Sequence, residues 1–130
     1  MMNTILKLTD LLQIENVIKT LRSELQSYNV PQETFFDIQL AITEAVNNAF
    51  IHGSKGLKKP LVEIQWWITS DKIQIKIKDN GPGFDYSQAG RFNVENILDE
   101  KGKGLFLMFS VLDKVWFNDQ GNEVYCLKKW

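Results

Sequence analysis

The chain has 130 residues, of which 44% are hydrophobic and 24% charged, and its formal net charge is −1. This length suits one globular domain and is too short for two, so we expect a single domain over residues 1–130. A charge so close to zero gives no reason to expect nucleic acid or a membrane surface as a partner. Cys126 and His52 are the only residues of their kinds, which excludes an internal disulfide and a zinc site built from several Cys and His side chains.

The sequence shows no signal for a membrane or for secretion. No apolar run in the sequence is long enough to span a bilayer. The N-terminal residues lack the apolar stretch and the cleavage site of a secretory signal. We therefore expect a cytoplasmic protein.

Hydrophobic periodicity predicts two helices in the first half of the chain. After a short strand at residues 4–8, apolar residues at helical spacing predict a helix over residues 10–28. Pro31 can occupy the first turn of a second helix. We expect that helix to run to about His52 and to end at Gly53 in the left-handed conformation.

Two strands follow, because apolar and polar residues alternate over residues 62–68 and 73–79. The same period of two places Asp79 on the isoleucine side of the sheet, which helices should cover. Trp67 faces the opposite side, where an exposed indole would suit a dimer or a partner protein. Packing against the N-terminal strand or helix explains Trp67 equally well.

The rest of the chain predicts a helix over residues 104–112 and strands at residues 115–117 and 123–127. Such segregation of helices and strands predicts an α+β fold. We expect a two-layer sandwich whose mixed, mostly antiparallel sheet is covered on one face by about three helices. The connection over residues 84–101 is long for a compact domain and is typical of a lid. Arg91 in it could reach a phosphate, or could simply be solvated.

The first segment whose side chains could take part in binding or catalysis is Glu-Ala-Val-Asn-Asn at residues 44–48. Glu44 and Asn48 are four residues apart on the predicted helix, so their side chains share one face, and His52 continues that stripe. A carboxylate can accept a proton from a nucleophile, and an amide oxygen can bind Mg²⁺. A solvated helix face explains the pair as well. The small alanines beside it and the asparagines in a helix interior favour a ligand site.

The second segment is Asp-Asn-Gly-Pro-Gly at residues 79–83. A tight turn after a strand explains its glycines. It does not explain Asp79, because a carboxylate on the covered side must find a donor or carry a heavy desolvation cost. The exocyclic amine of adenine is such a donor. Gly81 and Gly83 would let a flat base approach the backbone.

The third segment, Gly-Lys-Gly-Leu at residues 102–105, opens the predicted final helix. Free N–H groups at a helix start, together with Lys103, would form an anion site. Alone, the segment is equally explained as a flexible lead-in to a buried helix. Neither a Walker loop nor a dinucleotide fingerprint is present in the sequence. Taken together, the three segments supply the groups that a magnesium nucleotide needs.

In order and spacing, the three segments resemble the three boxes of the GHKL superfamily, whose ATP-binding domain is the Bergerat fold. Residues 42–53 are most similar to the small bacterial anti-sigma-factor serine/threonine kinases. The resemblance implies ATP and Mg²⁺ as cofactors, with Glu44 as the general base and Asn48 as the metal ligand. It assigns nucleotide contacts to the following residues of the boxes: Asn48, His52, Asp79, Gly81, Gly83, Gly102, Lys103, Gly104 and Leu105. Asn122 stands near the position where a threonine often helps to hold adenine in the family.

The resemblance also implies an activity and partners. It implies an ATP-dependent protein serine kinase that transfers the γ-phosphate to a serine of a STAS-type anti-anti-sigma protein. Sigma factors are bound by many family members, and homodimers are common. A non-catalytic regulator that uses nucleotide to set its shape is the alternative. The catalytic piece of a histidine kinase is disfavoured, because the sole histidine, His52, lies inside the first box.

Overall fold

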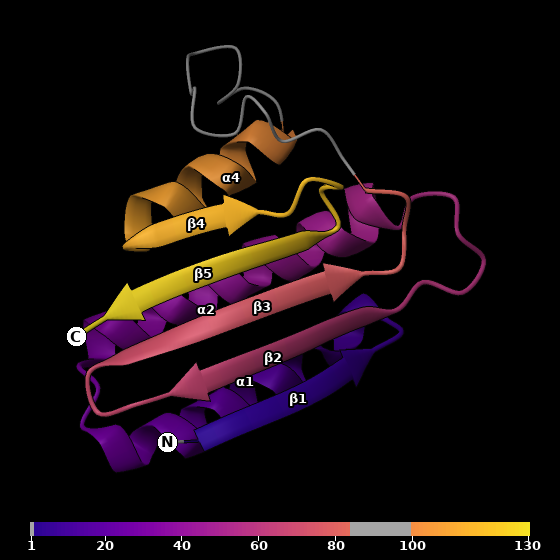
Figure 1. The fold of residues 1–130 in the computed structure, drawn as a ribbon. Coiled ribbons are helices and arrows are strands. Elements are labelled where there is room, and N and C mark those ends of the chain that lie inside the picture. The colour runs from indigo at the N-terminus through magenta and orange to yellow at the C-terminus, as the bar shows by residue number, and fades with distance from the viewer. Residues whose placement is uncertain (1, 84–99) are drawn as a thin grey trace.

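The computed structural model describes residues 2–83 and 100–130, and these form a sheet with helices packed on one face (Figure 1). The five strands are β1 (Met2–Leu8), β2 (Val62–Ile68), β3 (Lys72–Asp79), β4 (Lys114–Phe117) and β5 (Glu123–Lys129). Their order across the sheet is β1-β2-β3-β5-β4, and all four pairings are antiparallel. The predicted α+β sandwich is confirmed. The prediction allowed for some parallel pairing, whereas the described strands pair only antiparallel.

Three α-helices occur in the described part of the chain: α1 (Ile14–Leu25), α2 (Gln32–Asn48) and α4 (Glu100–Val111). Figure 1 shows α1 and α2 behind the sheet and α4 beside β4. The 3₁₀ turns η1 (Leu11–Gln13) and η2 (Gln26–Tyr28) extend α1 at either end, so the helix predicted over residues 10–28 is one α-helix between two tighter turns. None of these helices is long and apolar enough to cross a membrane.

The core lies between the helices and the sheet. Along β2 and β3, every second residue faces the helices and is buried: Val62, Ile64, Trp66, Ile68, Ile73, Ile75, Ile77 and Asp79. Burying an aliphatic side chain of this kind contributes roughly 1.5–3 kcal/mol. The indole N–H of Trp66 donates to Glu24 on α1 at 3.0 Å, which satisfies its one polar group. Asp79 therefore ends an apolar row on the covered side, as its sequence position predicts.

The end of α2 differs from the prediction. The helix stops at Asn48 and continues as a π-helical turn, η3 (Ala49–Gly53), which is closed by a 2.8 Å hydrogen bond from the Ser54 N–H to the Ala49 carbonyl. The expectation of a left-handed Gly53 is wrong. A π turn closes over five residues, and it redirects the chain before a left-handed residue is needed. Positive φ angles occur instead at three other glycines of the described chain: Gly56, Gly83 and Gly121.

The last helix also begins earlier than predicted. α4 starts at Glu100, so Gly102 lies in its first turn and Gly104 in its second, where a start near residue 104 was expected. The predicted lid, Arg91 included, falls almost entirely on residues 84–99, outside the described ranges.

Candidate functional site

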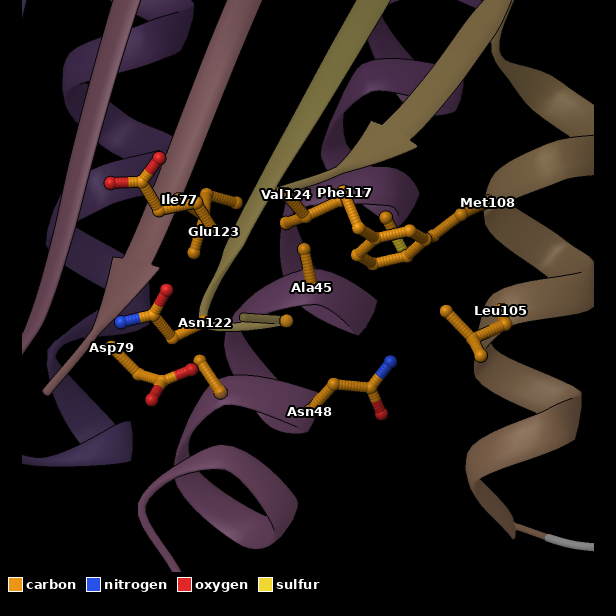
Figure 2. A pocket seen from close by; sticks show the side chains of 12 residues that line it. Ala45, Asn48, Ile77, Asp79, Leu105, Met108, Phe117, Asn122, Glu123 and Val124 are labelled. Atoms are coloured by element: carbon orange, nitrogen blue, oxygen red, sulfur yellow. The ribbon is translucent and has the colours of Figure 1, made fainter. Parts of the chain in front are cut away.

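A pocket opens between the helix layer and the sheet where β3 ends. It is lined by Ala45, Asn48, Ala49, Ile77, Asp79, Leu105, Met108, Phe117, Gly121, Asn122, Glu123 and Val124. In Figure 2, Asp79 from β3 and Asn48 from α2 lie on one side of it, and Leu105 and Met108 of α4 lie on the other. Its free volume is about 20 Å³, enough for a water molecule but too small for a purine ring.

Asp79 is the buried charge of this pocket, with 6% of its surface exposed. Its Oδ1 accepts a 2.8 Å hydrogen bond from the Gly81 N–H, and its own N–H donates to the Asn122 carbonyl at 3.0 Å. Burial raises the pKa of the Asp79 carboxyl above its ordinary value of 3.8, and the hydrogen bond from Gly81 offsets part of that rise. A buried carboxylate with one oxygen engaged in this way can accept a hydrogen bond from a ligand at the other.

Two glycines hold this carboxylate in place. A Cβ built on Gly53 would overlap the Asp79 carboxylate, and a Cβ built on Gly81 would overlap the Gly53 carbonyl. The η3 turn and the turn after β3 therefore meet backbone to backbone around Asp79, and a side chain at either glycine would separate them. From the sequence, Gly81 was predicted at the site, whereas Gly53 was predicted only at the end of a helix.

Neighbouring turns are fixed by asparagine side chains. Asn80 Oδ1 accepts from the Leu61 N–H at 2.9 Å, and its amide donates to the Lys59 carbonyl at 3.0 Å. Asn118 Oδ1 accepts from three successive backbone N–H groups of the β4–β5 turn, at 2.9, 3.1 and 3.0 Å. That turn carries Asn122, whose carbonyl holds the Asp79 N–H. Asn118 was not predicted from the sequence, although an asparagine ahead of a glycine turn is a recognisable signal.

At the other side of the pocket, α2 and α4 approach each other at a glycine. A Cβ built on Gly104 would lie 2.8 Å from Glu44 Oε2 and 3.6 Å from Asn48 Oδ1. Asn48 is 8% exposed and lines the pocket, as does Leu105, which directly follows Gly104. Residues from all three predicted segments therefore meet at one place, although the segments are far apart in the sequence.

Other predicted residues lie farther from the pocket wall. His52 is half-buried in η3 and is not among the lining residues, because the π turn after Asn48 breaks the i, i+4 stripe that the prediction assumed. Gly83 has φ of 95° and packs closely on the carbonyl of Gln120. Gly102 and Lys103 lie in the first turn of α4. Their roles towards a nucleotide stay predictions.

The apolar wall of the pocket was not predicted. Met108 lies three residues after Leu105 on α4, and Phe117 ends β4. Helical spacing from Leu105 could have identified Met108. Phe117 could not have been identified, because its place depends on how β4 pairs with β5.

Comparison with known proteins assigns the chain to a family. Residues 8–128 match the family described as the histidine kinase-like ATPase domain. Serine-protein kinase RsbW of Listeria monocytogenes serovar 1/2a is 29% identical over 104 residues, which cover 74% of this chain and 66% of that protein. Serine-protein kinase RsbW of Staphylococcus aureus strain bovine RF122 / ET3-1 is 38% identical over 87 residues, covering 61% and 55%. The match thus spans less than two thirds of these relatives' length.

One solved structure shows the same architecture. The catalytic domain of the histidine kinase ThkA, in a nucleotide-free form, superposes with a TM-score of 0.53 at 16% sequence identity. The superposition covers 98% of this chain and 94% of the other. At this identity the likeness shows a shared fold. With a family match over nearly its whole length, the chain belongs to the histidine kinase-like ATPase domain family, the GHKL type that the three segments resemble.

Proposed function

We propose that this protein binds ATP in the pocket at the end of β3 and transfers the γ-phosphate to a serine of a partner protein. The observation that carries the proposal is that two features lie at one pocket. One is a buried carboxylate, Asp79, held by glycine backbone, and the other is a helix contact that joins Glu44 and Asn48 to Gly104. The chain is in addition similar to proteins named serine-protein kinases.

The Asp79 end fits an adenine. Gly81 occupies one carboxylate oxygen of Asp79 and leaves the other for the exocyclic amine of the base. The close approach of Gly53 and Gly81 keeps side chains away from the carboxylate, so a flat ring can reach it. A purine needs more than the present 20 Å³. Nucleotide binding would therefore require this pocket to widen.

The α4 end fits the phosphates. The N–H groups of the first helical turn, at Gly102, attract anions, and Lys103 adds a positive charge in the same turn. The side-chain oxygen of Asn48 would hold Mg²⁺ together with phosphate oxygens. ATP would supply the phosphoryl group, and Mg²⁺ would neutralise the negative charge of the phosphates. Glu44 would orient the incoming serine hydroxyl and take its proton.

The partners follow from the resemblance to anti-sigma-factor kinases and from the names of the relatives. We assign a STAS-type anti-anti-sigma protein as the phosphate acceptor, a sigma factor as a second ligand, and the cytoplasm as the place of action. A homodimer is the assembly expected from the same resemblance. A non-catalytic regulator would bind nucleotide in the same pocket without turnover.

The decisive experiment uses Glu44→Gln, with Glu33→Gln in the exposed first turn of the same helix as control. With labelled Mg·ATP and STAS proteins encoded nearby, Glu44→Gln should lower phosphate transfer by roughly 10²–10⁴-fold. Calorimetry should show that its ATP affinity is nearly unchanged, because Glu44 acts on the hydroxyl and not on the base. Transfer at the wild-type rate would refute the role of Glu44.

Measurements on the wild-type protein distinguish the kinase from the non-catalytic regulator. Heat of Mg·ATP binding without phosphate transfer to any of these acceptors would favour the non-catalytic regulator. The absence of both heat and thermal stabilisation by Mg·ATP would remove the ATP proposal itself.

A further inference from the structure

The side of the sheet turned away from the helices has its own chemistry. Every second residue of the five strands points to that side, and we call it the open sheet face. Its charged members are six lysines and two glutamates: Lys7, Lys72, Lys76, Lys78, Lys114, Lys129, Glu63 and Glu123. They give this face a formal charge of +4 in a chain whose net charge is −1. In Figure 1 this face is turned towards the viewer, and no described element lies over it.

An apolar groove crosses the open sheet face. It has a volume of about 470 Å³, and its lining includes Trp67, Trp116 and Tyr125, with Lys72 at its border. Trp116 is 40% exposed, and Ile5 on the edge strand is 53% exposed. A large aromatic groove bordered by lysines is unusual on a surface that contacts only water, and aromatic residues are enriched where proteins bind each other.

We propose that the open sheet face is a docking site for an acidic protein segment. An aliphatic or aromatic side chain of the segment would enter the groove beside Trp67. Its carboxylates would lie over the lysines of β3, β4 and β5. Complementary charge of this kind steers the encounter and sets the register of binding. The site is on the opposite side of the sheet from the nucleotide pocket, so the proposal does not depend on kinase activity.

The aromatic rings favour a protein over nucleic acid. The rings of Trp116 and Tyr125 stack on each other, with centroids 5.4 Å apart and planes 6° from parallel. The Lys114 ammonium lies over the Trp116 ring, 5.6 Å from its centroid. Single-stranded nucleic acid binds by stacking its bases on free ring faces, and the stack with Tyr125 already occupies one face of Trp116.

The charge of the face argues against a second copy of the chain. In a two-fold dimer each surface meets an identical surface, so the open sheet face of one copy would bring its charge of +4 against the same charge on the other. Glu123 lies 3.9 Å from the Lys76 ammonium and 3.8 Å from that of Lys78, so it compensates these two lysines within one copy. The excess positive charge of the other lysines would have no such partner within either copy.

The test measures binding of a fluorescein-labelled peptide in which glutamates flank a leucine-phenylalanine pair, by anisotropy with the full chain at low salt. We compare wild type with Lys72→Glu/Lys129→Glu, a pair of register partners on the open sheet face. The control is Lys58→Glu/Lys59→Glu, two exposed lysines outside the strands. Charge reversal on the face should weaken binding by about tenfold or more, and the control should bind like wild type. Thermal melting verifies that both variants fold.

Several results would overturn the proposal. One is no saturable binding of the peptide by the wild type, and another is equal weakening in the control variant. Displacement of the peptide by single-stranded oligothymidine would assign the face to nucleic acid. A dimer in sedimentation that dissociates on Trp116→Ala would assign it to self-association.

Discussion

The two ends of the pocket are held in different ways. At the Asp79 end, backbone groups make the contacts: the Gly81 N–H, the Asn122 carbonyl and the main chain at Gly53. At the α4 end, the wall consists of side chains, among them Leu105 and the flexible Met108. The Asp79 carboxylate is thus positioned by the backbone, whereas the opposite wall of the pocket depends on where α4 lies.

The far end of α4 shows how that helix is held. The Lys128 ammonium donates to the carbonyl of Val111, the last residue of α4, at 2.6 Å, and pairs with Asp37 of α2 at 3.2 Å. One side chain from β5 thus links α4 and α2 at the end remote from the pocket. The near end meets α2 at Gly104, beside Glu44. Substitutions at the two ends of the pocket should therefore have different consequences.

The largest effect is expected for Gly53→Ala. Its Cβ would overlap the Asp79 carboxylate, so either the turn or the carboxylate must move. We expect a loss of about 1–3 kcal/mol in unfolding free energy, measured by urea denaturation, together with loss of ATP binding in calorimetry. Gly56→Ala is the matched control, because φ of 84° strains an alanine there while no atom lies near its Cβ. It should lose stability and keep ATP affinity. Equal ATP affinities in both variants would show that Gly53 does not position Asp79.

The next effect is expected for Asp79→Asn. A hydrogen bond to a charged group contributes about 1.5–3 kcal/mol, which corresponds to a Kd for ATP about 10- to 150-fold higher. The neutral side chain can still accept the bond from Gly81, so thermal melting should show a folded protein. ITP has a carbonyl oxygen in place of the exocyclic amine, so it should bind the wild type weakly and the variant no less tightly, because the new amide can donate to that oxygen. A variant that binds ATP as tightly as wild type would reject the adenine contact.

Asp79 also predicts a pH dependence. Burial raises the pKa of its carboxyl above 3.8, so the carboxylate is protonated at a higher pH than an ordinary aspartate. ATP affinity should fall as the pH falls through that raised pKa, because the protonated acid loses the charged acceptor for the hydrogen bond from the amine. The stability of the ligand-free protein should move the opposite way, since protonation relieves the cost of a buried charge. Calorimetry and melting as a function of pH test both signs, and Asp79→Asn should lack both.

A smaller effect is expected for Gly104→Ala, at the other end of the pocket. Its Cβ would lie 2.8 Å from Glu44 Oε2, and the flexible end of that side chain can shift by a few tenths of an ångström. We expect roughly tenfold slower phosphate transfer, because small displacements of a reacting group are costly. Binding of a nonhydrolysable ATP analogue should change less than the rate. If affinity and rate fall equally, Gly104 serves nucleotide binding and not the position of Glu44.

The smallest effect is expected for Lys128→Met, remote from the pocket. Removing the bonds to Val111 and Asp37 should lower the unfolding free energy by about 1 kcal/mol, because the pair is partly exposed. Lys129→Met, the neighbouring residue on the open sheet face, is the control. ATP affinity should be unchanged in both variants. A large loss of affinity in Lys128→Met would mean that the far end of α4 controls the pocket.

Much of the fold could be predicted, because it follows from local periodicity. The period of two identified β2 and β3 and placed Asp79 on the covered side, and helical spacing identified α1 and α2. The predicted ends of the helices were less accurate than their existence. α4 begins before its two glycines, and α2 passes into a π turn, because the neighbours of these segments in space decide where a helix ends.

What the sequence by itself determined is therefore the class of fold, the three segments of the site and the side of the sheet on which the residues of β2 and β3 lie. These depend on side-chain order along a backbone of fixed geometry. Tertiary structure alone decided that Gly53 touches Asp79, that Gly104 meets Glu44, and that strands from both ends of the chain bring their lysines to one face of the same sheet. Those contacts join residues distant in the chain, and only the packing of the elements brings such residues together.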